Sequence, residues 1–204
     1  MEMSLIQMFQ NRGCLQVTPD YSFTYASGLK GPIYCDNRLI IGDTEIRQAV
    51  LHSLISKIKE TDIKVEAIMA MATGAIALGS LIADRLNVPL GYVRSQKKGH
   101  GTSSLIEGGV DVSHKVLVVE DLINQGSSIK KGIEALQSEG FEVIGVLSIV
   151  NYEFDHVSKY FGELNVPIWS IIGMSDLLNH FENEGKIGVK NTLNKWHTEL
   201  NTDN

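Results

Sequence analysis

The sequence predicts an α/β protein built on a parallel sheet with helices on both faces. Apolar runs of strand length alternate along most of the 204 residues with segments whose apolar residues recur at helical spacing. Two of these apolar runs lead into short loops rich in glycine, threonine and serine. No internal repeat and no Pro-, Gly- or Ser-rich linker divides the chain. Such alternation is typical of sheets whose ligands bind beyond the carboxyl ends of the strands.

The chain begins with a segment that precedes the alternation. Residues 2–12 are predicted as a short helix ended by Gly13, and residues 15–41 as strands separated by turns at 18–20 and 27–28. This part is expected to form a small hood over the ligand edge of the sheet.

The alternation itself starts with a long helix. Asp43 and Thr44 are suited to cap its N-terminus. Its predicted buried stripe is Ile46, Val50, Leu54 and Ile58. Strands are then predicted at 65–71, 90–94, 115–120, 142–151 and 167–172, and helices at 75–86, 128–139, 153–163 and 174–183. We expect one domain of residues 1–204, with a hood at 1–41, an α/β core at 42–183 and a helical tail at 184–204.

Composition excludes several classes of protein. A net charge of -6 argues against broad electrostatic binding of nucleic acid or of an anionic membrane. The apolar stretch 67–83 is short and contains Thr73 and Gly74, so a strand, a loop and a helix explain it better than a membrane span. The N-terminus lacks the pattern of a signal peptide, and only two cysteines, Cys14 and Cys35, are present. A cytoplasmic protein in a reducing setting is expected.

The stretch from Val116 to Ser128 is the most informative part of the sequence. Apolar residues of a buried strand are followed by Glu120 and Asp121, which are expected to end the strand, and then by a polar loop with Gly126 and a helix start. Free backbone N–H groups at a helix start attract phosphate, and carboxylates accept hydrogen bonds from sugar hydroxyls. An ordinary βα turn with solvated acids is the alternative. The coincidence of buried strand, paired acids and phosphate-type loop favours a site for a phosphorylated sugar.

Two further segments are expected at the same edge of the sheet. The loop 72–75, between a strand and a helix, is suited to pyrophosphate, although its small residues also suit close helix–sheet packing. Segment 94–104 is a glycine-containing loop whose possible cations are Arg94, Lys97, Lys98 and His100. Loops of this composition often close as lids over a substrate, whereas the alternative is a solvated charged surface.

Segment 27–38, with Lys30, Asp36 and Arg38, completes a pattern that resembles the orotate phosphoribosyltransferases of the type I phosphoribosyltransferase family. The resemblance spans roughly residues 22–178, with these segments in the family's order. It implies that Lys30 lies at the base site. Thr73 and Gly74 would bind pyrophosphate, together with a lid carrying Arg94, Lys97, Lys98 and His100. Glu120 and Asp121 would hold the ribose, and Asn124, Gln125, Gly126, Ser127 and Ser128 would hold the 5′-phosphate. Leu122 and Ile123, between these two groups, would also belong to the substrate site. Lys98, His100 and Asp121 are the implied catalytic residues.

The same resemblance implies an activity. A member of this family transfers the phosphoribosyl group of phosphoribosyl pyrophosphate (PRPP) to orotate, giving orotidine 5′-monophosphate and pyrophosphate in pyrimidine biosynthesis. Mg²⁺ is the implied cofactor, bound mainly through pyrophosphate, so no residue is assigned as a metal ligand. The family also implies a homodimer in which the lid reaches the neighbouring subunit.

Departures from the family pattern leave alternatives open. Gln125 is bulkier than the usual threonine. Ser127 stands where the family usually has glycine, and glycine would be favoured there if the backbone needed a positive φ. Gly99 replaces an acid of the lid. A phosphoribosyltransferase for another base and a non-catalytic PRPP-binding regulator are the competing hypotheses. A dinucleotide-binding enzyme is disfavoured, since no G-x-G-x-x-G follows a strand.

Overall fold

The computed structural model describes residues 3–25, 28, 30–96 and 104–202 of the chain. The strands are β1 (Leu15–Val17), β2 (Phe23–Thr24), β3 (Lys30–Gly31), β4 (Ile33–Cys35), β5 (Ala67–Met71), β6 (Leu90–Val93), β7 (Ile106–Glu107), β8 (Lys115–Ile123), β9 (Glu142–Asn151) and β10 (Ile168–Gly173). The helices are α1 (Leu5–Arg12), the 3₁₀ helix η1 (Asn37–Gly42), α2 (Thr44–Glu60), α3 (Ile76–Leu86), α4 (Ser127–Ser138), α5 (Asp155–Glu163), α6 (Met174–Asn183) and α7 (Ile187–Thr202).

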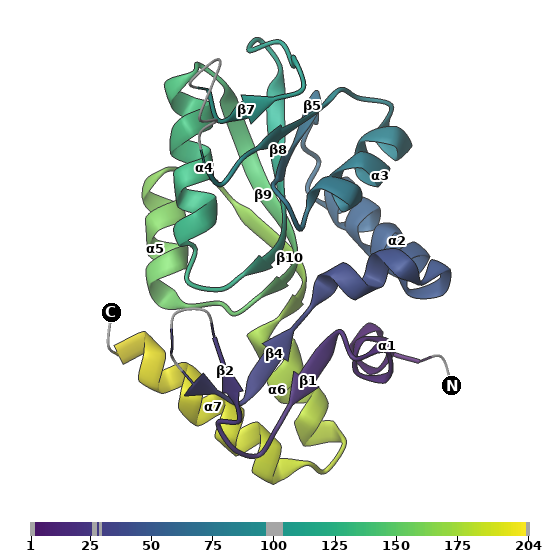
Figure 1. Ribbon diagram of the computed structural model, residues 1–204, viewed down its shortest axis with the longest axis vertical. Coiled ribbons are helices and arrows are strands. Elements are labelled where there is room, and N and C mark those ends of the chain that lie inside the picture. Colours follow the sequence, from purple (N-terminus) through teal and green to yellow (C-terminus); the bar gives the residue numbers. More distant parts are fainter. Residues whose placement is uncertain (1–2, 26–27, 29, 97–103, 203–204) are drawn as a thin grey trace.

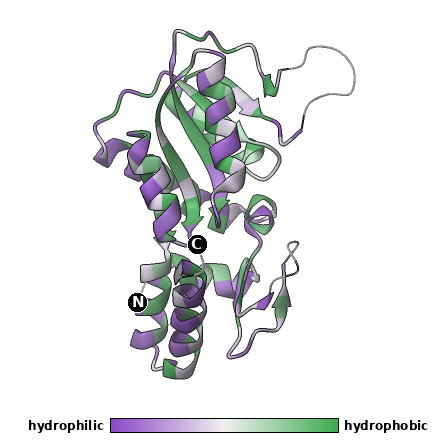
Figure 2. Ribbon diagram, turned by 90° about the vertical axis from the view of Figure 1, so that its left-hand side faces the viewer, coloured by the Kyte–Doolittle hydropathy of each residue, from purple (hydrophilic) through white to green (hydrophobic). Residues whose placement is uncertain are grey.

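The main sheet has six strands in the order β10-β9-β8-β5-β6-β7. All neighbouring pairs are parallel except the edge strand β7, which runs antiparallel to β6. Helices α4 and α5 cover one face, and α2 and α3 cover the other (Figure 1). The strands are largely apolar between helices that carry polar residues outward (Figure 2). The predicted α/β fold with a mostly parallel sheet is confirmed.

The centre of the sheet explains its apolar sequence. Every residue of β5 is buried, because neighbouring strands flank it and helices lie over both faces. The predicted stripe of α2 is also buried, and Asp43 caps that helix by accepting hydrogen bonds from the N–H groups of Glu45 and Ile46. These elements follow directly from local sequence pattern.

Two predicted element boundaries are wrong. Residues 37–42 form a 3₁₀ helix instead of a strand, because the Asp36 side chain caps it by accepting a hydrogen bond from the Arg38 N–H. Strand β8 does not stop at Glu120 and Asp121 but continues to Ile123. Its pairing with β9 extends that far, and this pairing outweighs the low strand propensity of the acids.

The N-terminal segment and the C-terminal helix lie side by side (Figure 1). Strands β1 and β4 pair antiparallel, as do β2 and β3. Helix α7 contacts this segment through Trp196, whose ring lies 6.2 Å from that of Tyr25 and 5.7 Å from that of Tyr152. Tyr21 also donates a hydrogen bond to Glu199 over 3.1 Å. Residues predicted as a tail therefore help to hold the hood on the core.

Among the helices that the structure describes, none has the length and apolar character needed to cross a membrane.

Candidate active site

The two acids of β8 are held by the backbone of their own strand. Glu120 is 7% exposed, and its Oε1 accepts a hydrogen bond of 2.9 Å from the Asp121 N–H. Asp121 is half-buried, and its Oδ1 accepts one of 2.9 Å from the Leu122 N–H. Both carboxyl groups are thus fixed in orientation before any ligand arrives.

Their surroundings change the ionisation of Glu120. Burial, followed by the neighbouring Asp121 side chain, raises its pKa to about 9, although the hydrogen bond from the Asp121 N–H acts in the opposite direction. Glu120 is therefore neutral at pH 7 in the absence of ligand. The sequence analysis gave both acids a place at the ribose, and the structure adds that Glu120 is the more deeply buried of the two.

The loop after β8 turns directly into helix α4. Gly126 takes a left-handed conformation with φ of 71°, and a Cβ at this position would lie 3.1 Å from Val157 Cγ2. Ser127 is the first residue of α4, so the positive φ falls on Gly126 and a glycine at 127 is not needed. Serine at position 127 is therefore compatible with the backbone of this loop.

This loop surrounds a small pocket beside a helix start that no side chain caps. The pocket has a volume of about 100 Å³, and the residues that line it are Glu120, Leu122, Ile123, Asn124, Gln125, Gly126, Ser127, Ser128 and Ile129. The N-terminus of α4 receives no hydrogen bond from a capping side chain, whereas Ser4 caps α1 and Asp43 caps α2. An uncapped helix start offers its N–H groups to an anion.

A second uncapped helix start lies next to Asp121. Helix α3 has no side-chain cap, and the loop 72–75 leads into it from β5. The peptide bond between Ala72 and Thr73 is cis. A Cβ on Gly74 would lie only 2.7 Å from Asp121 Cγ, so the loop can pack against this carboxyl group only with glycine there. The structure therefore brings Gly74 and Asp121 together, with Thr73 exposed beside them.

Of the remaining predicted site residues, the structure describes Arg94 and Lys30. Arg94 follows β6, and its Nη1 lies 3.4 Å from Glu107 Oε1. Lys30 lies exposed in β3 of the hood. Lys97, Lys98 and His100 lie outside the described residues.

Two contacts at the site were not predicted from the sequence. Asn37 of the hood donates a hydrogen bond of 2.7 Å from Nδ2 to the carbonyl oxygen of Asp121. His156 Nε2 lies 3.3 Å from the carbonyl oxygen of Gln125. A lone asparagine or histidine carries no motif, although the place of Asn37 within segment 27–38 was a usable signal.

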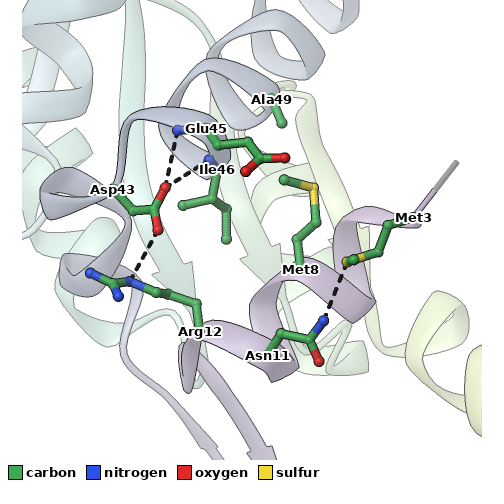
Figure 3. A pocket seen from close by; sticks show the side chains of 8 residues that line it. All are labelled: Met3, Met8, Asn11, Arg12, Asp43, Glu45, Ile46 and Ala49. Carbon is green, nitrogen blue, oxygen red and sulfur yellow. Dashed lines mark hydrogen bonds and ion pairs between the residues drawn. The ribbon is translucent and has the colours of Figure 1, made fainter.

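Another hollow, of about 520 Å³, lies between α1 and the start of α2 (Figure 3). None of the predicted site residues lines it. Its charged residues include Arg12 and Asp43, which pair with each other at 3.5 Å. Arg12 is therefore already paired, and the start of α2 beside the hollow is capped by Asp43. The hollow thus lacks the uncapped helix starts that are found at the carboxyl end of β8.

Within the described part of the chain, no group of three or more His, Cys, Asp or Glu side chains could hold a metal ion.

Comparison with known proteins identifies the family. Residues 39–176 match the model of the phosphoribosyl transferase domain. The orotate phosphoribosyltransferase of Staphylococcus aureus (strain MSSA476) is 39% identical over 186 residues, which cover 90% of this chain and 92% of that protein. The orotate phosphoribosyltransferase of Bacillus cytotoxicus is 42% identical over 176 residues, covering 86% of this chain and 84% of that protein.

A solved structure agrees with this assignment. The crystal structure of orotate phosphoribosyltransferase from Aeropyrum pernix matches with a TM-score of 0.76 at 30% identity, over 88% of this chain and 98% of that one. The elements that carry the β8 edge, from β5 to α6, fall almost entirely within the residues that match the domain model. The chain belongs to the orotate phosphoribosyltransferase family.

Proposed function

We propose that this protein transfers the phosphoribosyl group of PRPP to orotate, forming orotidine 5′-monophosphate and releasing pyrophosphate. One observation carries the proposal furthest. Two uncapped helix starts, those of α3 and α4, flank the carboxyl end of β8, where Asp121 packs against Gly74. Two anion sites on either side of a carboxylate suit a sugar that carries a phosphate at one end and a pyrophosphate at the other.

The 5′-phosphate would bind at residues 124–128. The donors there are the backbone N–H groups at the start of α4, and Gly126 lets the chain turn closely around the phosphate. Leu122 and Ile123 supply the apolar wall on the β8 side of the pocket. Asp121 would accept hydrogen bonds from the ribose hydroxyls, with the neutral Glu120 beside it.

The pyrophosphate would bind at Thr73 and Gly74 and at the start of α3. Arg94 lies at the end of β6 next to that loop's strand, and the family resemblance adds Lys97, Lys98 and His100 as a closing lid. Cations above a departing pyrophosphate stabilise the negative charge that develops as its bond to C1 breaks. Lys98 and His100 are therefore proposed as catalytic residues together with Asp121.

The reaction needs no protein nucleophile. As the bond between C1 and pyrophosphate breaks, positive charge develops on the ribose, and the orotate nitrogen attacks from the opposite face. The protein holds the ribose and its phosphates in place, and this lowers the entropic part of the activation free energy. Lys30 is proposed to contact the base from the hood.

Mg²⁺ fits this edge of the site as an ion held mainly by the substrate. The half-buried Asp121 is the carboxylate that packs against the Gly74 loop, and carboxylate oxygens suit a hard cation. Bound with pyrophosphate, the ion would neutralise part of the leaving group's charge.

We further propose that residues 1–204 work as a single domain in a cytoplasmic homodimer whose lid is shared between subunits. Support for the setting comes from the two cysteines of the chain, which are both free. Support for the shared lid comes only from the family resemblance.

The direct test is spectroscopic. Protein, Mg²⁺, PRPP and orotate are mixed and the ultraviolet loss of orotate is followed, with uracil and hypoxanthine in parallel reactions. Turnover of orotate alone is expected. Turnover of uracil or hypoxanthine instead would show that the protein acts on another base. Tight PRPP binding without turnover of any base would favour a non-catalytic PRPP-binding regulator.

The Asp121→Asn variant tests the site itself. We expect it to fold, to melt near the wild-type temperature and to lose about 10²-fold or more of its activity, the scale of removing one preorganised charged group. Full activity in this variant would show that the ribose is held elsewhere.

A further inference from the structure

We propose that Asn37 is a positioning residue for phosphoribosyl transfer, because it fixes the backbone of Asp121 and with it the orientation of the Asp121 carboxylate. The inference rests on the proposed role of Asp121 at the ribose. Asn37 itself lies in the hood, on the N-terminal side of the long helix α2, and is 84 residues away in sequence. It acts through Asp121 and is not assigned any contact with substrate.

The need for such a residue arises from the ends of the strands. Pairing between β5 and β8 runs from Ala67–Val116 to Ala70–Val119 and stops there, while β8 itself continues to Ile123. Asp121 therefore lies beyond the pairing with β5. Its backbone groups are bonded by side chains: Glu120 Oε1 accepts from its N–H at 2.9 Å, and Asn37 Nδ2 donates to its carbonyl oxygen at 2.7 Å.

The amide of Asn37 is fixed at both ends. Its residue is only 4% exposed, and its Oδ1 accepts a hydrogen bond of 3.2 Å from the Cys35 thiol. This contact leaves Nδ2 directed at Asp121. A hydrogen bond from a side chain shielded from water in this way is costly to lose.

The effect on the site follows from how Asp121 is held. The N–H, the carbonyl oxygen and the carboxylate of Asp121 are each in a hydrogen bond, and the carboxylate packs against Gly74. Its carbonyl shares a peptide unit with the Leu122 N–H, which donates to Asp121 Oδ1. Releasing the carbonyl allows this peptide unit to turn, and the carboxylate then loses the N–H group that fixes its orientation. A small misplacement of a substrate-positioning group is enough to lower the rate substantially.

The bond also joins two parts of the proposed site. Asn37 belongs to the hood, from which Lys30 is proposed to contact the base, and Asp121 is proposed to hold the ribose. The hood and the ribose site are therefore connected by one partly buried hydrogen bond, so that a displaced hood would disturb PRPP as well as orotate.

Two variants of the same residue test the inference. For Asn37→Ala we expect kcat/KM for PRPP to fall about 10-fold, the factor that corresponds to one buried hydrogen bond. For Asn37→Asp we expect at least the same loss, because a carboxylate cannot donate to the Asp121 carbonyl. Cys35→Ser is the matched control: it keeps a donor for Asn37 Oδ1 and should stay within about twofold of wild type.

The decisive readout is a double-mutant cycle with Asp121→Asn. If Asn37 acts through Asp121, Asn37→Ala should cost less than about twofold in the Asp121→Asn background. Losses that multiply in the double variant, or a wild-type kcat/KM in Asn37→Ala, would overturn the inference. Full activity in Asp121→Asn alone would instead overturn the proposed ribose site.

Stability is followed separately. Activity is measured well below the melting temperature of the least stable variant, so that unfolding does not lower the rate. If Asn37→Ala does not fold, Asn37→Thr, which fills more of the vacated space, takes its place in the same cycle, and the same two outcomes decide.

Discussion

Replacing Glu120 by glutamine should stabilise the protein, and the gain should grow with pH. Glu120→Gln keeps the shape of the side chain and an oxygen that accepts the Asp121 N–H, but it removes a carboxyl group that cannot ionise freely where it lies. Burial, together with the neighbouring Asp121 side chain, raises the pKa of Glu120 from 4.5 to about 9 on folding. The unfolded chain therefore loses this proton at a lower pH than the folded protein does.

The sign and size of the effect follow from this difference. A folded-state pKa above the unfolded value means that the contribution of the neutral carboxyl group to stability is complete below pH 4.5 and is lost as the pH rises toward 9. Each pH unit in that window is worth about 1.4 kcal/mol, so the wild type has lost about 3 kcal/mol at pH 7. The glutamine variant escapes this loss.

Urea unfolding of both proteins at pH 5, 6, 7, 8 and 9 measures the difference in free energy of unfolding. We expect the advantage of Glu120→Gln to increase with each step and to level off above pH 9. The exposed Glu163 supplies a control variant, Glu163→Gln, whose difference from wild type should stay small and constant. A pH-independent difference for Glu120→Gln would refute the reasoning about its burial.

Three further outcomes are expected at the proposed substrate site. Gly74→Ala should abolish most PRPP binding in calorimetry, since its methyl group would collide with Asp121, whereas Gly162→Ala, with no atom within 4 Å of the added Cβ, should bind normally. Lys98→Ala should keep the wild-type melting temperature, and its kcat should fall about 10²-fold, which is the usual effect of removing one group that stabilises charge in the transition state. An unchanged kcat would argue against a role of Lys98 in a lid. Mixing Lys98→Ala with Asp121→Asn should restore part of the activity if the lid acts across a dimer, and proven heterodimers without recovery would exclude that arrangement.

Local pattern was sufficient for most of the fold. Residues 142–151 and 174–183 were predicted as a strand and a helix, and the structure has β9 and α6 at those bounds. The apolar period of these segments agrees with what they bury, so sequence and packing give the same answer. The wrong boundaries, at 37–42 and at the end of β8, depend on a side-chain cap and on pairing with β9, which the sequence pattern does not display.

The candidate site divides in the same way. Glu120, Asp121 and Gly126 were predicted because the motif that contains them is continuous in sequence. Asn37 and His156 were missed because each reaches the site from a distant element. Asn37 contacts Asp121 of β8 and His156 contacts Gln125 of the loop, through hydrogen bonds that only the folded chain makes. The raised pKa of Glu120 was missed for a similar reason, since it comes mainly from burial.

The unusual side chains of the 124–128 loop are compatible with the proposed phosphate site. The family resemblance left the fit of Gln125 and Ser127 in question, but the structure places the left-handed residue at Gly126 and starts α4 at Ser127. Phosphate binding at a helix start depends on backbone N–H groups, which any residue except proline supplies. The backbone of Gln125 has its own support, since its carbonyl oxygen lies 3.3 Å from His156 Nε2. The loop can therefore vary in its side chains while its backbone geometry, set by Gly126 and by contacts from α5, keeps the proposed anion site.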